Sequence, residues 1–241
     1  MHRKKWFEYL LETGFLFLAV FLGVFADNFR VEKLEEKQEK IYISSMIKDL
    51  ADDTTNLSIV LKEFVIKDLN IDTLLKMYDK LTTGYNHTLW RNFSSLRSFP
   101  DFISTDQTIL QLKNTGGMQL IHRKVALCEI IKYDSKLKDL ALDVKSLDER
   151  YTKIRDLRYE LIDTKNLDLD KSRMSIEEIE KGSKNYLLIN NMATIGKLYN
   201  IIQDYKRVMS LVVKDEEKLK QEAIDLILLL KKEYNLNNQH N

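Results

Sequence analysis

The chain has 241 residues, of which 44% are apolar and 31% are charged, and its formal net charge is +1. This balance argues against a nucleic-acid-binding protein, because such proteins carry a positive excess that neutralises phosphates. One proline and seven glycines are too few for the many turns of an all-β fold. The composition therefore predicts an all-α protein with long helices and a sizeable core.

The first predicted element is an apolar helix near the N-terminus. Residues 13–26 (TGFLFLAVFLGVFA) are fourteen in a row without a charge. A helix needs about 20 residues to cross a ~30 Å hydrocarbon layer, and extending this run back to Trp6 supplies that length. Trp6 and Phe29 would then be interfacial aromatic residues. We predict a single transmembrane helix, with residues 1–29 as membrane anchor, 30–236 as helical bundle domain and 237–241 as disordered tail.

Two other interpretations of the apolar segment stay open. The basic start at residues 2–5 and the small residues at 24–26 also fit a cleavable signal peptide, and a short apolar run also fits a buried helix of a soluble protein. Glu8 and Glu12 before the run, and a helical pattern that continues past Asp27, favour an uncleaved anchor. We expect the N-terminus inside, the anchor in the inner membrane and the bundle in the periplasm.

A stripe on the predicted membrane helix contains Glu12, Ala19 and Gly23. Small residues four positions apart let another helix approach closely, so this stripe is a candidate contact for a partner helix. Glu12 would then bind a cationic or hydrogen-bonding group, or carry a proton. The alternative is that Glu12 reaches the lipid headgroups and that the small residues are ordinary membrane composition.

The remainder of the chain contains three long stretches in which apolar residues alternate three and four positions apart. This spacing predicts coiled-coil-like packing, and further apolar residues beside it favour three or four helices. We predict an elongated antiparallel three- to four-helix bundle, with long helices ending near Leu81 and spanning about 118–162 and 191–234. The spaced positions are Ile47, Leu50, Thr54, Leu57, Leu61, Phe64, Asp68, Ile71, Leu75 and Tyr78; then Ile130, Tyr133, Leu137, Leu140, Val144, Leu147, Tyr151, Ile154, Arg158 and Leu161; then Ile195, Leu198, Ile202, Tyr205, Met209, Val212, Glu216, Leu219, Ala223, Leu226 and Leu230.

Two short helices are predicted in the connections. Ser104 with Gln107, and Ser175 with Glu178, have capping-box spacing, and glycines at 116–117 and 182 mark the ends. If the first long helix leaves the bilayer directly, the first connection is distal to the membrane. The polar link at residues 163–173 would then lie near the membrane.

The first connection also contains a cluster of aromatic and arginine residues, the types that protein–protein interfaces favour. It is a candidate interaction loop, and the alternative is that its rings plug the open end of the bundle. The residues are Tyr85, Trp90, Arg91, Phe93, Arg97, Phe99 and Phe102.

The sequence offers no motif for catalysis, a cofactor or a metal. It contains no glycine-rich phosphate loop, nucleophile elbow or CxxC pair. Its four histidines are far apart, and the single cysteine, Cys128, is predicted to be a small core residue. We expect no enzymatic activity, no cofactor and no metal.

Two stretches resemble a family of small single-pass membrane proteins of unknown function from Bacteroidota. They are LGVFADNFR at residues 22–30 and ILQLKNTGGMQLIHRKVALCEIIKY at 109–133. The resemblance implies an inner-membrane protein with an exported helical domain, and it implies no activity.

The leading functional hypothesis is a non-enzymatic, membrane-anchored structural or accessory subunit. Its bundle would bind other membrane or envelope proteins, or further copies of itself. One alternative is a membrane-tethered sensor or regulatory domain that acts through a partner. Another is an accessory subunit of an ion-coupled motor or transporter built around Glu12.

Overall fold

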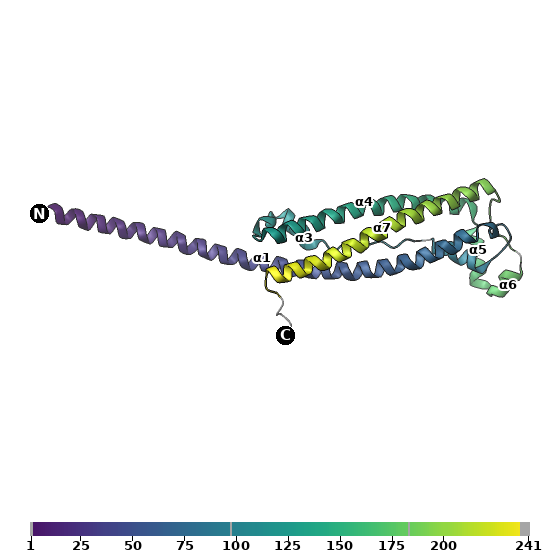
Figure 1. Cartoon of the computed structure of the whole chain (residues 1–241), viewed down its shortest axis with the longest axis horizontal. Coiled ribbons are helices and arrows are strands. Elements are labelled where there is room, and N and C mark those ends of the chain that lie inside the picture. Colours follow the sequence, from purple (N-terminus) through teal and green to yellow (C-terminus); the bar gives the residue numbers. More distant parts are fainter. Residues whose placement is uncertain (1, 97, 183, 237–241) are drawn as a thin grey trace. The chain divides into compact units, whose positions relative to one another are not determined.

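The computed structural model describes residues 2–96, 98–182 and 184–236, with side chains from residue 11 onward (Figure 1). Across these residues the chain is α-helical without a β-strand, and its only β-type pairing is an isolated bridge between Ile162 and Leu187. The all-α prediction is confirmed. The elements are α1 (His2–Lys76), η1 (Tyr78–Lys80), α2 (His87–Ser95), α3 (Gln107–Asn114), η2 (Gly117–Leu120), α4 (Lys124–Leu161), α5 (Thr164–Arg173), α6 (Ile176–Lys181) and α7 (Met192–Glu233).

The chain forms two compact units. The first comprises Met1–Asp49, Asp106–Cys128 and Leu229–Asn241, and the second comprises Leu50–Thr105 and Glu129–Leu228. The predicted boundary at residues 29 and 30 lies inside α1, which continues through it without a break.

In the second unit, α7 runs antiparallel to both α1 and α4. As residue numbers rise along α1 or α4, the numbers of their partners on α7 fall. Helices α1 and α4 therefore run in the same direction in this unit. For α1 the contacts are Asp68 to Lys206 at 3.3 Å and, just past its end in η1, Tyr78 to Tyr199 at 4.7 Å between ring centroids. For α4 they are Lys136 to Glu222 and Arg150 to Asp204 at 2.7 Å.

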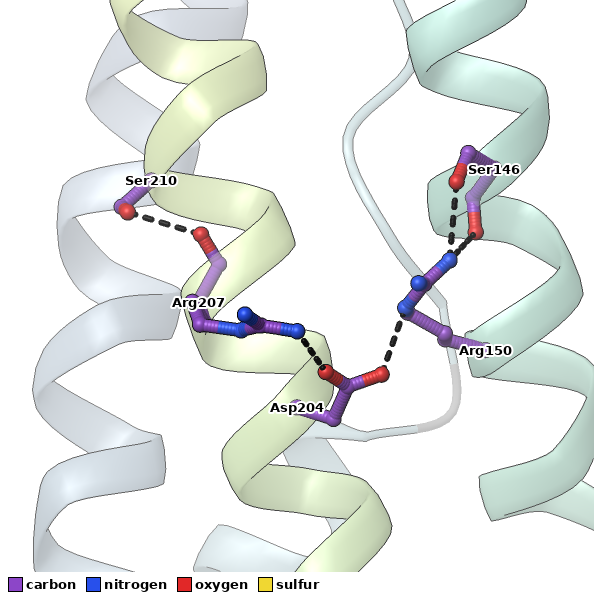
Figure 2. A network of polar contacts seen from close by, with 5 residues as sticks. All are labelled: Ser146, Arg150, Asp204, Arg207 and Ser210. Carbon is purple, nitrogen blue, oxygen red and sulfur yellow. Dashed lines mark hydrogen bonds and ion pairs between the residues drawn. The ribbon is translucent and has the colours of Figure 1, made fainter.

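A polar network fixes α4 against α7 (Figure 2). Arg150 donates from Nε to Asp204 at 2.7 Å and also donates to the carbonyl and hydroxyl oxygens of Ser146. Arg207 donates to the other oxygen of Asp204 at 2.7 Å, and Ser210 donates to the carbonyl oxygen of Arg207. The hydrogen bond from Arg207, followed by the smaller contribution of the one from Arg150, holds the pKa of the Asp204 carboxyl below its usual value. The contact between Arg150 and Asp204 therefore links α4 to α7 on their polar sides.

The predicted stripes of α7 and α4 are confirmed. All eleven predicted positions of α7 are buried, including Glu216. On α4, seven of the ten predicted positions are buried and three are half-buried. A stripe of this kind provides most of a helix's stability, because helix propensity alone contributes little.

The predicted buried stripe of α1 is correct at alternate positions only, and the positions between them are not buried. Leu50, Leu57, Phe64 and Ile71 are buried as expected, but the alternate buried positions lie one residue earlier than predicted. The reason is that two of those earlier positions are charged, so sequence patterning passed over them. The buried stripe is Ile43, Met46, Leu50, Asp53, Leu57, Val60, Phe64, Lys67, Ile71 and Leu74.

The short helices partly match the prediction. Ser175 and Glu178 form the predicted capping box of α6, and Gly182 is its C-cap. Helix α3, however, begins after Asp106 and has no side-chain cap, so the capping box predicted at Ser104 is wrong. The amide of Thr108 in its first turn instead donates to the Asp49 carboxylate at 3.0 Å. A tertiary contact thus replaces the local cap.

Two of the described α-helices were not predicted. Residues 87–95 form α2, capped by Asn86, and residues 164–173 form α5, capped by Asp163, which accepts from the Asn166 amide at 3.1 Å. The Lys171 ammonium donates to the Ser94 hydroxyl at 3.2 Å, so α5 and α2 lie together in the second unit. The prediction that residues 163–173 lie at the opposite end from the first connection is therefore wrong.

Candidate functional site

The most distinctive surface of the molecule is the apolar part of α1. Every residue from 11 to 34 is exposed, so no other described part of the chain covers this segment. Successive residues of a helix are turned by about 100°, so neighbouring apolar residues in this segment point in every direction. The large side chains are Phe15, Leu16, Phe17, Leu18, Val20, Phe21, Leu22, Val24 and Phe25, each between 54% and 74% exposed. By length and composition this helix can cross a membrane.

The predicted stripe of Glu12, Ala19 and Gly23 lies on this exposed segment. An added Cβ at Gly23 would meet no atom within 4 Å, so no described residue uses the close approach that the glycine allows. The stripe as a partner contact stays a prediction. The side chain of Trp6 lies outside the described residues.

Two members of the candidate interaction loop are core residues. Trp90 is 0% exposed and Phe93 is 2% exposed. The Trp90 ring meets Tyr186 edge-on with centroids 5.8 Å apart, and Phe93 meets Tyr199 edge-on at 6.3 Å. These two rings therefore plug the bundle and do not form an accessible surface. Sequence patterning missed Tyr186, which lies in an irregular segment with no period to mark it.

The other loop residues are partly accessible. Tyr85 is half-buried with its ring edge-on to Tyr186, and Phe99 is half-buried against Tyr151 at 5.4 Å between centroids. Phe102 is half-buried and Arg91 is exposed, while Arg97 lies outside the described residues. The structure thus separates Phe99 and Phe102, in the irregular segment after α2, from Tyr85 and Arg91, which line one groove together.

Two buried charges fix that irregular segment to α1. The Asp53 carboxylate accepts from the Thr105 amide at 2.6 Å and from the Tyr133 hydroxyl at 2.8 Å. Lys67 donates to the carbonyl oxygens of Ser95, at 2.9 Å, and Ser98. Burial lowers the pKa of the Lys67 ammonium to about 8. An extended segment without a strand partner needs such groups, because buried backbone N–H and C=O groups must be hydrogen-bonded.

A third buried charge, Glu39, organises the first unit. Its carboxylate accepts from the backbone amide of His122 at 2.9 Å and from the Tyr234 hydroxyl, and lies 3.2 Å from Nδ1 of His122. The hydrogen bond to Glu39 raises the pKa of the exposed His122 imidazole above its usual value. An open groove of 480 Å³ adjoins these groups, and the Arg123 guanidinium stacks on Tyr234 at its edge.

Glu216 differs from these three charges because the structure gives it no partner. Its side chain is 0% exposed, and neither carboxylate oxygen is hydrogen-bonded to a described residue. Burial raises the pKa of this carboxyl to about 8, and the nearby charge of Asp101 acts in the same direction. Glu216 is therefore largely protonated at neutral pH.

The described part of the chain contains no group of three or more His, Cys, Asp or Glu side chains placed to hold a metal ion. Cys128 is exposed, so the prediction that it is a core residue is wrong. The reason is that it lies next to buried positions of α4 but outside their stripe, since Ala126 and Ile130 are buried on either side of it.

Comparison of the chain with family models, with curated proteins and with solved structures gives no match. The resemblance to the Bacteroidota membrane family therefore stays a prediction.

Proposed function

We propose that this protein is a non-enzymatic, membrane-anchored structural or accessory subunit whose helical bundle binds other proteins. One observation carries the proposal. The apolar segment of α1 exposes large aromatic and aliphatic side chains on all sides, and no described residue covers them. Monomeric soluble proteins rarely expose apolar patches of this extent.

Lipid explains this exposure better than a protein partner does. A partner helix or sheet covers one side of a helix and leaves the opposite side polar, whereas hydrocarbon surrounds the whole circumference. Leu16, Phe17 and Leu18 point in three different directions, because successive residues are turned by about 100°, and all three are more than half exposed. A bilayer is the environment that satisfies all of them at once.

The polar residues that follow support the same assignment. Arg30 pairs with Asp27 at 3.1 Å, and Lys33 pairs with Glu36 at 2.8 Å, in both cases with exposed side chains. Such pairs are stable in water and unfavourable in hydrocarbon. The apolar segment would therefore end near Ala26. We further propose that the anchor lies in the inner membrane, with the N-terminus inside and the bundle in the periplasm.

Protein binding by the bundle is supported by a second apolar surface in the second unit. Ile59, Ile66 and Leu69 lie on the outer side of α1 and are 53%, 61% and 62% exposed. Their spacing of seven and three residues places them on one face of the helix. An apolar row on one face is what a protein partner, or another copy of this chain, can cover.

Membrane fractionation combined with cysteine labelling tests the proposal. We expect the full chain to stay in the membrane pellet after alkaline carbonate washing and to copurify with a fixed set of envelope proteins, or with itself, in mild detergent. Cys128 is the single cysteine and is exposed, so a membrane-impermeant maleimide should label it from the periplasmic side.

A matched control reports the other side of the membrane. A Cys128→Ser chain carrying His2→Cys should be labelled only after the membrane is opened. Recovery of the washed chain in the soluble fraction would contradict the anchor, and labelling of His2→Cys in intact cells would reverse the orientation.

A further inference from the structure

The second unit has a patch of exposed apolar side chains on the outer side of α1, opposite the buried stripe of that helix. At about 100° per residue, these side chains fall within roughly a third of the helix circumference. No described residue covers them. The patch consists of Ile59, Val65, Ile66 and Leu69, which are 53%, 60%, 61% and 62% exposed.

Two opposite charges lie on the same side of the helix as this patch. Lys62 and Glu63 are both exposed, and neither forms an ion pair or a hydrogen bond with any residue that the structure describes. By contrast, Asp68 and Asp72 further along α1 both pair with Lys206 of α7. The patch therefore offers a cation and an anion to a partner outside the described chain.

The spacing within the patch is that of a two-stranded coiled coil. Ile59 and Ile66 are seven residues apart and Leu69 follows three residues later, so the isoleucines take heptad position a and the leucine position d. A β-branched residue at a with leucine at d favours a parallel pair of helices. Lys62 then occupies the preceding d position, and Glu63 occupies the e position beside it.

The charges match when the partner is a second, parallel copy of the same helix. A residue at d packs between residues of the facing helix that include its e position, so each Lys62 reaches the second copy's Glu63. A two-fold interface repeats every contact, so two ion pairs form. Glu63 and Ile66 also border an open groove of 210 Å³, which leaves room beside Glu63 for the incoming lysine. In an antiparallel pair, by contrast, a faces d, and Lys62 would lie against the second copy's Ile66.

The short length of the patch makes the membrane important. Residues 59–69 extend over about 15 Å of helix, which is too short for a stable interface between chains free in water. Confining both copies to one bilayer raises their local concentration, as linking two binding modules does. Two anchors that cross one bilayer in the same sense also favour the parallel pair.

We propose that residues 59–69 of α1 form the contact between two copies of this chain, as a parallel, in-register pair of helices. Ile59, Ile66 and Leu69 pack on their counterparts, and Lys62 binds Glu63 across the pair. This assignment rests on the proposed function, because the anchor brings the copies together and the assignment names the partner that this part of the bundle binds.

Cysteine cross-linking in membranes tests the assignment, with single cysteines in a full-length Cys128→Ser chain. Ile59→Cys and Leu69→Cys should each form a disulfide-linked dimer with itself on mild oxidation, because a parallel, in-register pair sets identical positions face to face. The matched control is Leu142→Cys, at an apolar position of α4 that is 67% exposed, which should stay monomeric under the same oxidation.

A charge exchange tests the ion pairs. Lys62→Glu alone, or Glu63→Lys alone, should slow cross-linking at Leu69→Cys about tenfold, because each change sets like charges against one another twice in the pair. The two changes combined should restore cross-linking, since the ion pairs form again with their signs exchanged. Both positions are exposed, so the melting temperature should stay unchanged in all three variants.

Three results would overturn the assignment. The first is no more cross-linking at Leu69→Cys than at Leu142→Cys, and the second is a combined charge exchange that links no faster than the single changes. The third is Ile59→Cys that links to Leu69→Cys in coexpressed chains but not to itself, which would show an antiparallel pair. Carbonate washing of the same membranes tests the anchor separately. A chain that stays in the pellet without linking contradicts the pair alone, while a chain that links but washes off contradicts the anchor alone.

Discussion

Helix α1 contains two regions that differ in how their apolar residues are arranged. Residues 13–26 carry apolar side chains in every direction, and none of them is covered. Residues 43–74 carry a single buried stripe with three-four spacing, and that stripe includes the charges Asp53 and Lys67. The first arrangement needs a solvent that is apolar on all sides, and the second needs a protein core on one side.

This difference also explains where charge is tolerated. In the buried stripe, Asp53 and Lys67 are stabilised by hydrogen bonds to backbone groups at the end of α2 and in the segment after it. None of the described residues packs on the apolar segment to pair with a charge, so a charge there would have to be hydrated or expelled. The same helix therefore accepts a lysine at position 67 and should reject one at position 17.

The largest expected effect follows directly. Phe17→Lys combined with Phe21→Lys should move the chain out of the carbonate-washed membrane pellet, because each charge at the centre of a spanning helix costs about 2.5–3.5 kcal/mol. Immunoblotting of the pellet and supernatant measures this. The matched control is Ile59→Lys combined with Leu69→Lys, which places the same charges at exposed apolar positions of the second region and should leave the chain in the pellet. Equal retention of both double variants would remove the distinction between the two regions.

A second prediction concerns the core that the stripes build. Trp90→Ala should lower the free energy of unfolding by about 3–5 kcal/mol, because it leaves a large cavity at a fully buried position. Chemical denaturation in detergent, followed by circular dichroism, measures the change. Leu142→Ala, at a side chain that is 67% exposed, should stay within about 0.5 kcal/mol of the wild type. If Trp90→Ala lowers the free energy of unfolding only slightly but weakens partner binding, this ring belongs to an interaction surface and not to the core.

The third prediction concerns Glu216, the buried carboxyl group for which the structure describes no hydrogen-bond partner. Folding raises the pKa of Glu216 from 4.5 to about 8, so the folded protein retains a proton that the unfolded chain releases. Stability should therefore be greatest below pH 4.5 and fall by roughly 1.4 kcal/mol per pH unit as the pH rises toward 8, as far as this residue is concerned. Glu216→Gln should remove that slope. Parallel slopes for the wild type and Glu216→Gln between pH 5 and pH 8 would show that a partner stabilises the charged carboxylate.

A smaller effect is expected from the charges that do have partners. Asp53→Ala should cost about 1–3 kcal/mol, because it leaves the Thr105 amide and the Tyr133 hydroxyl without an acceptor. The control is Asp52→Ala, an exposed carboxylate one position earlier in the same helix, which should be nearly neutral. Hydrogen exchange at the Thr105 amide should rise in Asp53→Ala and not in Asp52→Ala. If both variants behave alike, the segment after α2 is held by other contacts.

The same two kinds of region show what sequence patterning could predict. The stripe of α7 was found in full, because apolar spacing alone defines it and its one charge, Glu216, interrupts it only once. The stripe of α1 was placed one residue too late at alternate positions, because Asp53 and Lys67 look like surface residues until their backbone partners are known. Patterning reads one segment at a time, whereas these charges are explained by residues 28 to 52 positions away.

The connections were predicted least well for a related reason. The capping box at Ser175 is local and was found, while α3 is held by Asp49 from another helix and its start was missed. Helices α2 and α5 are short, so each contains too few turns to show a period. The pairing of Lys171 with Ser94, which brings α5 and α2 together, leaves no trace in the sequence.

Spin-label accessibility along the apolar segment tests the central claim most directly. Single cysteines introduced at each position from 13 to 26 of a Cys128→Ser chain would be labelled and measured in lipid bilayers with oxygen and with a water-soluble nickel reagent. Lipid on all sides predicts high oxygen access and low nickel access at every position, without a helical period. A 3.6-residue period with one protected face, or nickel access throughout, would contradict the account.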